Sequence, residues 1–117
     1  MSITTHEIVI QIDVQSRNTF DRLHWAAKRR IRQEYELLIR NKMRLGKVPL
    51  AEEKKYKMVI TSSRKRLLDL SNLYGGIKQL EDALCNEKFI WDDAPKYLDL
   101  EVIQVLGEPR TIIRREG

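Results

Sequence analysis

Four aspartates and a lysine lie between residues 69 and 93 of a chain that is otherwise basic. These residues are Asp69, Lys78, Asp82, Asp92 and Asp93. Carboxylates can hold Mg²⁺ through hard oxygen ligands and leave coordination positions for water and phosphate. The metal lowers the pKa of a bound water, and a nearby lysine adds positive charge where a phosphate becomes more negative. The residue types therefore suggest hydrolysis of a phosphodiester bond.

Ordinary structural roles are open to the same residues. Asp69 precedes an expected helix and is suited to a cap or turn, and Asp82 lies four residues beyond Lys78, the spacing of an ion pair on a helix. The stretch "WDDAP" is suited to a solvated turn. The sequence contains no short signature of a metal site. On pattern alone, both interpretations stay open.

Length and charge limit the possible classes of protein. Residues 1–117 suffice for one domain with a single core, and 22 Lys and Arg against 17 Asp and Glu give a net charge of +5. That balance favours a polyanion such as nucleic acid as partner. The single Cys85 excludes an internal disulfide and a multi-cysteine zinc site, and it fits a reduced, cytoplasmic compartment. We expect neither a membrane span nor a secretory signal, because no long apolar run is present.

Two clusters of cations are candidates for contacts with DNA phosphates. They comprise Lys28, Arg29 and Arg30 in an expected helix and Arg64, Lys65 and Arg66 after an expected strand. A solvated helix face is the alternative for the first cluster. Trp25 and Trp91 are expected in the core, although either could stack on a base. His24 is expected to be structural, and Cys85 to be buried.

Hydrophobic periodicity predicts the elements of the first half of the chain. Isoleucines and a valine alternate over residues 7–14, which predicts a strand with one buried face. The spacing then changes to three and four residues, which predicts one long helix over residues 20–43. Asn18 or Thr19 is expected to cap this helix, and Gly46 to end it. The apolar face of the helix comprises Phe20, Leu23, Ala27, Ile31, Tyr35 and Leu38.

The second half of the chain predicts strands at residues 54–63, 96–106 and 110–116 and a helix at 72–86. Leu73, Ile77, Leu80 and Leu84 form the buried stripe of that helix. Each glycine of the pair Gly75–Gly76 costs about 1 kcal/mol relative to alanine inside a helix, so we expect a backbone or a phosphate to approach closely there. The order β-α-β-α-β-β predicts an α+β domain, with two helices packed on a mixed sheet.

This order suggests how the acidic residues meet. If the strand at 96–106 pairs beside the strand at 54–63, we expect the loops that carry Asp69 and the pair Asp92–Asp93 to lie at the same end of the helices. Asp69 would then share a cation with Asp92 or Asp93.

The ordered motifs of the chain resemble those of the RusA-type Holliday junction resolvases, small metal-dependent endonucleases common in bacterial prophages and phages. The resemblance rests on "LDLSNLYGGIKQLEDAL" followed by "WDDAPKYLDLEV". Upstream, "SRNTFDRLHWAAKRR" is similar to the S-x-N…H-W segment of the family. The likeness runs from about residue 8 to residue 105, nearly the whole chain.

The resemblance implies a cytoplasmic homodimer that binds four-way DNA junctions and nicks two strands symmetrically with Mg²⁺, for which Mn²⁺ is a possible substitute. By position, it implies that Asp69 and Asp93 hold the metal, that Lys78 assists catalysis, and that Asp82 and Asp92 are supporting acids.

One position departs from the family motif D-x-D-N, because Ser71 replaces its second aspartate. Serine is neutral and a weak ligand for Mg²⁺. An active nuclease is therefore one hypothesis, and a relative that binds junctions without cutting is another. A small structural or regulatory domain without nucleic-acid function is a third.

Overall fold

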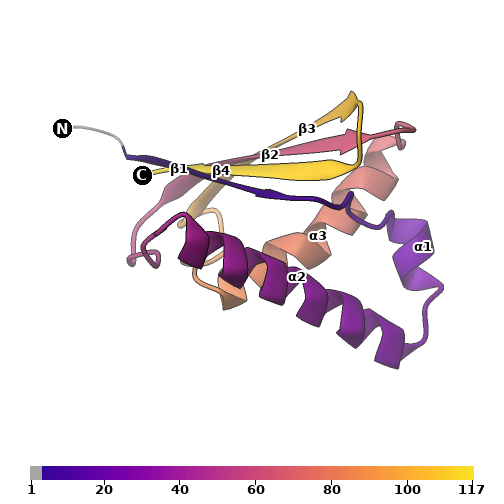
Figure 1. Ribbon diagram of the computed structural model, residues 1–117, viewed down its shortest axis with the longest axis horizontal. Helices are drawn as coiled ribbons and strands as arrows, with labels where there is room; N and C mark the ends of the chain where they lie inside the picture. The colour runs from indigo at the N-terminus through magenta and orange to yellow at the C-terminus, as the bar shows by residue number, and fades with distance from the viewer. Residues whose placement is uncertain (1–3) are drawn as a thin grey trace.

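The computed structural model describes residues 4–117, which form a four-stranded mixed sheet with all helices on one face (Figure 1). The strands are β1 (Thr5–Ile10), β2 (Tyr56–Arg64), β3 (Leu98–Leu106) and β4 (Arg110–Glu116). The helices are α1 (Arg17–Asp21), α2 (Trp25–Leu45) and α3 (Leu70–Asn86). The expected α+β class and mixed sheet are confirmed, with α1 as a short additional helix.

The sheet has the strand order β1-β4-β2-β3. β4 pairs antiparallel with β1 and with β2, whereas β2 and β3 are parallel and are joined through α3. Alternate side chains of β2, such as Met58 and Ile60, are buried beneath the helices, while Lys57 is exposed. The expected pairing of the third strand beside the second is confirmed. Because β3 runs parallel to β2, the acidic residues that follow β2 and those that precede β3 lie at opposite ends of the strand pair.

Residues 17–45 form two helices instead of the single helix expected over 20–43. The hydroxyl of Ser16 accepts a hydrogen bond from the backbone N–H of Thr19 (3.1 Å) and caps α1. The ring of His24 accepts one from the N–H of Ala26 (3.3 Å) and caps α2. Each cap satisfies a backbone donor that a helix start leaves free, so two caps in succession begin two helices. The expectation of a cap at Asn18 or Thr19 is therefore wrong, and the structural role of His24 is confirmed.

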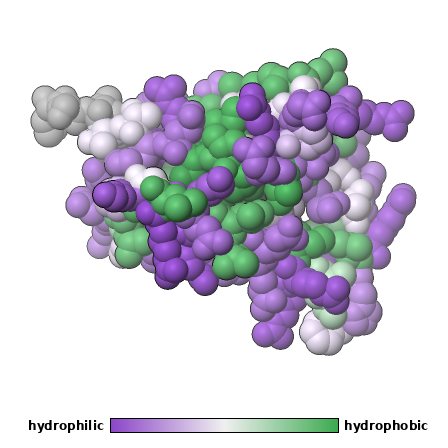
Figure 2. Space-filling view, viewed as in Figure 1, coloured by the Kyte–Doolittle hydropathy of each residue, from purple (hydrophilic) through white to green (hydrophobic). Residues whose placement is uncertain are grey.

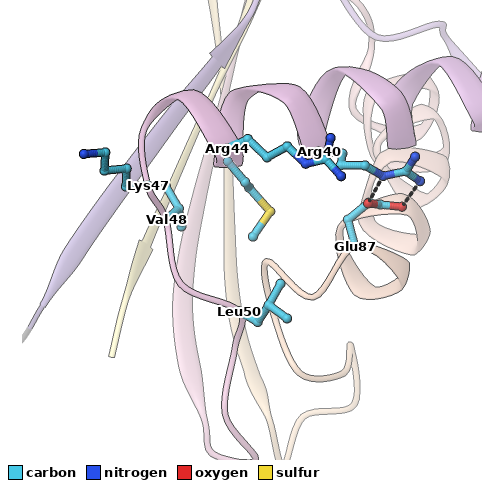
Figure 3. Close-up of a pocket in the computed structure, with 7 residues that line it drawn as sticks. Arg40, Arg44, Lys47, Val48, Leu50 and Glu87 are labelled. Atoms are coloured by element: carbon cyan, nitrogen blue, oxygen red, sulfur yellow. Dashed lines mark hydrogen bonds and ion pairs between the residues drawn. The ribbon is translucent and has the colours of Figure 1, made fainter.

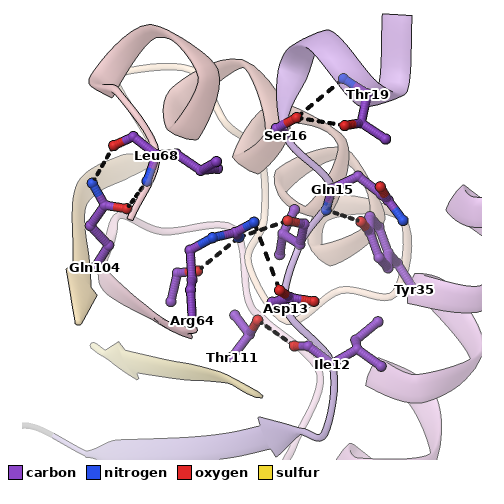
Figure 4. Close-up of polar contacts among 12 residues, drawn as sticks. Ile12, Asp13, Gln15, Ser16, Thr19, Tyr35, Arg64, Leu68, Gln104 and Thr111 are labelled. Atoms are coloured by element: carbon purple, nitrogen blue, oxygen red, sulfur yellow. Dashed lines mark hydrogen bonds and ion pairs between the residues drawn. The ribbon is translucent and has the colours of Figure 1, made fainter. Parts of the chain in front are cut away.

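The first strand is shorter than the expected 7–14, because the chain leaves the sheet after Ile10. Backbone groups of the departing segment bind to side chains of other elements instead (Figure 4). Thr111 donates to the carbonyl of Ile12 (2.8 Å), and the N–H of Gln15 donates to the hydroxyl of Tyr35 (3.1 Å). These bonds fix residues 11–16 between the sheet and the helices.

The core lies between the sheet and the helices. Tyr35, Ile39 and Met43 of α2 are buried, whereas the expected apolar face at the start of this helix is only half-buried. The expected stripe of α3, from Leu73 to Leu84, is confirmed. Trp91 packs against this core, but the expectation of a buried Trp25 is wrong, since that side chain is 67% exposed.

The glycine pair in α3 marks a close approach of two backbones, as expected. A Cβ atom on Gly76 would lie 2.0 Å from the carbonyl oxygen of Gln15. A Cβ on Gly75 would meet the side chain of Arg17 at 2.5 Å. Glycine is therefore retained here because α3 packs directly onto the segment that leaves β1.

We predict that Gly76→Ala destabilises the protein. Alanine would favour the helix by about 1 kcal/mol, but overpacking against a backbone atom that cannot rotate away costs about 1–3 kcal/mol or more. Urea denaturation of the variant tests this against Gly46→Ala. Gly46 has φ −86° and a nearest neighbour 3.3 Å from the added Cβ, so that change should be small. Equal stability of both variants would contradict the close packing.

Candidate metal and nucleic-acid site

Lys78, in the middle of α3, is surrounded by carboxylates. Its Nζ donates a hydrogen bond to Oδ2 of Asp93. It also lies 3.7 Å from Oδ1 of Asp82 and 4.0 Å from Oε2 of Glu81. The two helical acids reach it because residues three and four positions apart share one side of a helix. Asp93 comes from the connection between α3 and β3, so the tertiary structure joins it to this face.

Asp92 and Asp93 lie together with Cys85, whose thiol is half-buried. One ligand atom from each of the three lies within 4.8 Å of the others. Oδ1 of Asp92 also accepts a hydrogen bond from the backbone N–H of Asp93 (2.8 Å). Burial and the neighbouring acids raise the pKa of Cys85 to about 12, so the free thiol is protonated at neutral pH.

The electrostatics of this cluster follow from its single ammonium group. The hydrogen bond from Lys78 lowers the pKa of Asp93 below its usual 3.8, and the same bond raises the pKa of Lys78. Burial raises the pKa of Glu81, which is half-buried beside them. The carboxylates outnumber the one lysine, so the cluster keeps a negative charge that favours a cation.

The donor set at Asp92 and Asp93 fits a hard divalent ion. Lys78 contacts one carboxylate oxygen of Asp93, and a carboxylate oxygen of Asp93 lies within 4.8 Å of one of Asp92. Mg²⁺ is commonly held by one or two carboxylates while water and substrate phosphates complete its octahedron. Asp82, on the same side of Lys78, is a further oxygen donor at the edge of the cluster.

Asp69 is not part of this cluster. Its carboxylate caps α3, accepting hydrogen bonds from the backbone N–H (2.9 Å) and the side-chain amide (2.8 Å) of Asn72. These bonds lower the pKa of Asp69. Lys78 lies nine residues further on, which is roughly 13 Å along the helix axis. The expectation that Asp69 and Asp93 share one cation is therefore wrong for a single chain.

The parallel pairing of β2 and β3 explains this separation. The end of β2, which leads to Asp69, and the start of β3, which follows Asp93, lie at opposite ends of the pair. The connection after α3 brings Asp93 back only as far as Lys78. Ser71 lies exposed in the first turn of α3, beside Asp69, and adds no charge there. The residues expected to form one metal site thus lie at two positions along α3, with Asp69 at its start and Asp93 beside its middle.

The expected DNA-binding residues differ in their exposure to solvent. Arg29, Arg30, Lys65 and Arg66 are exposed and Lys28 is half-exposed, so phosphates can reach them. Arg64 is only 7% exposed, because its guanidinium turns inward. The expectation that Arg64 contacts DNA is therefore wrong.

Arg64 instead holds the segment that leaves β1 (Figure 4). It donates to the carbonyl of Val14 (2.8 Å) and to Oγ of Ser62 (3.3 Å), and it lies 3.8 Å from the carboxylate of Asp13. Within residues 4–117, its Nε is a buried polar atom without a hydrogen-bond partner. A cleft of about 270 Å³ beside it is also lined by Lys65 and Arg66. Arg64 therefore supports the floor of a basic cleft without forming its exposed surface.

The helices α2 and α3 run parallel, and this places the basic residues relative to the acids. Arg32 donates to Gln79 (2.8 Å), and Arg40, eight residues later, donates to Glu87, eight residues later on α3. The first turn of α2 is therefore level with the start of α3. At this end, Figure 2 shows hydrophilic side chains mixed with neutral and hydrophobic ones, and a larger hydrophobic area nearer the sheet.

A hollow of about 440 Å³ lies at the other end of α2 (Figure 3). Arg40 closes one side of it with two hydrogen bonds to the carboxylate of Glu87 (2.8 and 2.9 Å). The other lining residues are Met43, Arg44, Lys47, Val48 and Leu50. None of these residues belongs to the acidic cluster, so the hollow and the candidate metal site are separate features.

The sequence reasoning missed Glu81 and Cys85 as members of the cluster. Both follow from helical spacing, since they lie three and seven residues after Lys78 and so on the same side of α3. The same helical spacing predicts that Lys78 and Asp82 are neighbours. The contact of Lys78 with Asp93 was not, because it depends on the path of the loop after α3.

Neither a scan against protein-family models nor a search of curated proteins finds a match to this chain. The helices within residues 4–117 are all too short or too polar to cross a membrane.

We predict that Asp69 acts as a cap and not as a metal ligand. Asp69→Ala should lower the melting temperature, whereas Asp69→Asn should largely retain it, because asparagine caps a helix as well as aspartate does. Titration calorimetry with Mn²⁺ should give the same affinity for Asp69→Asn as for the parent chain, and a weaker affinity for Asp93→Asn. Equal loss of metal affinity in both variants would place Asp69 in the metal site.

We predict a pH-dependent contribution from the ion pair of Lys78 with Asp93. The lowered pKa of Asp93 means that its contribution is present above pH 3.8 and is lost as the pH falls through the lower folded value. The stability gap between the parent chain and Asp93→Asn should therefore be positive at pH 7, less than about 1 kcal/mol for so exposed a pair, and close in acid. Asp99→Asn, at an exposed position on β3, serves as the matched control. A gap that widens in acid would contradict the assigned pair.

Proposed function

We propose that this chain is a Mg²⁺-dependent, structure-selective endodeoxyribonuclease that acts on four-way DNA junctions. The proposal follows the resemblance to RusA-type resolvases, with a homodimer whose two sites each nick one strand. Mn²⁺ is proposed as a substitute for Mg²⁺. The setting proposed is the cytoplasm of a bacterium, with the protein encoded by a phage or prophage.

The observation that carries the proposal is the acidic cluster around Lys78. A basic chain that gathers several carboxylates around one lysine provides both a place for a hard cation and a positive group beside it. Asp92 and Asp93 supply two oxygen ligands, which suits an ion that also binds a phosphate. The proposed site differs from the one implied by the resemblance, since Asp69 lies at another level of α3.

The roles of the residues follow from their positions. Asp92 and Asp93 would hold the metal, and Mg²⁺ when bound would activate water and offset charge on the phosphate. Asp82 and Asp93 keep the ammonium of Lys78 beside this point, where it can contact a phosphate oxygen. The cations on α2 and after β2 attract the sugar–phosphate backbone from a distance. Chemistry and DNA positioning would thus depend on different side chains.

Two observations favour a second candidate function, a relative that binds branched DNA without cutting it. Ser71 is neutral where the resembling family has an aspartate, and Asp69 is displaced from Asp93 along α3. Either change reduces the number of carboxylates that a phosphate-bound metal could contact. The exposed cations would remain available for DNA binding.

We predict that the protein cleaves a labelled four-way junction in Mg²⁺ or Mn²⁺ and not in EDTA. Asp93→Asn should reduce cleavage to the level seen in EDTA, because it removes a ligand and the partner that positions Lys78. Asp99→Asn removes an equal charge from an exposed position on β3 and should leave cleavage unchanged. Denaturing gels measure the products, and native gels measure binding to the junction and to a duplex of the same sequence.

The outcomes separate the candidates. A gel shift of the junction without cleavage supports the second function, and cleavage gained by Ser71→Asp would strengthen it. Cleavage lost in Asp99→Asn as fully as in Asp93→Asn would show that the acidic cluster is not the site. Equal binding of junction and duplex would contradict both functions and leave a domain without a role in branched DNA.

A further inference from the structure

Trp25 is a large aromatic side chain that the fold leaves uncovered. It is the first residue of α2, and 67% of its surface is exposed. The start of α2 does not require an indole, because the ring of His24 caps the helix. That ring lies against the indole at a tilt of 40°, with 5.5 Å between centroids. The contacts within residues 4–117 therefore account for where Trp25 lies, but they do not require a tryptophan at this position.

Three cations lie close to this indole along the chain. Lys28 and Arg29 lie three and four residues later, one turn along the same side of α2. Arg22, exposed in the break before α2, is a further positive group close in sequence. Lys28 also lies 5.6 Å from the centroid of the Phe20 ring, which holds it at this end of the helix. An exposed aromatic ring within a group of cations provides a stacking surface for a base and partners for its phosphates.

The location of Trp25 agrees with a nucleic-acid contact. The contact of Arg32 with Gln79 fixes the level of α2 beside the lysine of the acidic cluster. Trp25 lies seven residues before Arg32, which is about 10 Å along the axis. The exposed Lys65 and Arg66 follow β2, at the end of α3 that is level with the start of α2. The two basic segments thus lie at the same end of the molecule along its long axis, with the end of β2 and the start of α2 on opposite sides of that end (Figure 1).

We propose that Trp25 stacks on an exposed face of a DNA base, one not covered by a neighbouring base, while Lys28 and Arg29 bind the phosphates on either side of it. A duplex covers its base faces in continuous stacks, whereas a single strand exposes them and the open centre of a four-way junction leaves its innermost base pairs without a stacking neighbour on one side. The choice of DNA as ligand rests on the proposed function, but the contact requires neither a metal nor cleavage. It makes Trp25 a residue that selects DNA with exposed base faces over continuous duplex.

The test uses binding in EDTA, so that it is independent of the nuclease reaction. With Trp91→Phe as background, Trp25 is the one tryptophan of the chain, and its fluorescence is titrated with oligothymidylate, a four-way junction and a long blunt-ended duplex. We expect quenching by the first two ligands. Trp25→Ala should weaken their binding by roughly 5- to 100-fold, the effect of one base–aromatic stack, and should change duplex binding much less.

Two variants control for structure. Trp25→Phe keeps a smaller ring and should bind with intermediate affinity. Leu45→Ala removes a 79% exposed apolar side chain at the other end of α2 and should bind like the parent chain. Circular dichroism of each variant verifies folding.

Unchanged affinity and fluorescence in these titrations would overturn the proposal. So would fluorescence of Trp25 that depends on protein concentration without DNA, since a second copy of the chain would then cover the indole. Quenching without any junction cleavage would support the stacking contact and contradict the proposed nuclease activity. Cleavage by Trp25→Ala at the parent rate, with unchanged binding, would remove the stacking contact and leave the nuclease.

Discussion

The close contact between the backbone of residues 12–16 and helix α3 is the constraint on which the rest of the structure depends. This segment has left the sheet, so its polar backbone groups must find partners elsewhere. Arg64 of β2 and Thr111 of β4 donate to the carbonyls of Val14 and Ile12. Tyr35 accepts from Gln15, and Gly76 lets α3 approach the carbonyl of Gln15 without a side chain between them. Two strands and two helices are thereby fixed against one stretch of backbone, at the cost of burying a charged group.

This contact determines which residues can meet. With its first half held against residues 12–16, α3 presents Asp69 at one end and Lys78 in its middle. The following loop returns along the helix and places Asp93 on Lys78. A capping carboxylate and a cluster of carboxylates thus occupy different levels of the same helix. The cap stabilises the helix, and the cluster provides the negative charge that a cation would need.

Charge is distributed over the molecule in a way that suits a polyanionic partner. The chain has a net charge of +5, with exposed cations around the start of α2 and in the connection after β2, while acids gather around Lys78. Long-range attraction needs no fixed geometry and depends on the total field. A metal site does need fixed geometry, and it is built where helical spacing and a loop converge. The two requirements are met by different parts of one small domain.

The sequence by itself determined the class of fold, the alternating strands, the stripe of α3 and the close approach at Gly76, because periodicity and glycine report local constraints. Helical spacing also contained the pairing of Lys78 with Asp82. Only the tertiary structure decided that Asp93 joins them, that Asp69 does not, and that Arg64 is buried while Trp25 is exposed. Those facts depend on the direction of strand pairing and the path of loops. No local pattern encodes them, because the partners lie far apart along the chain.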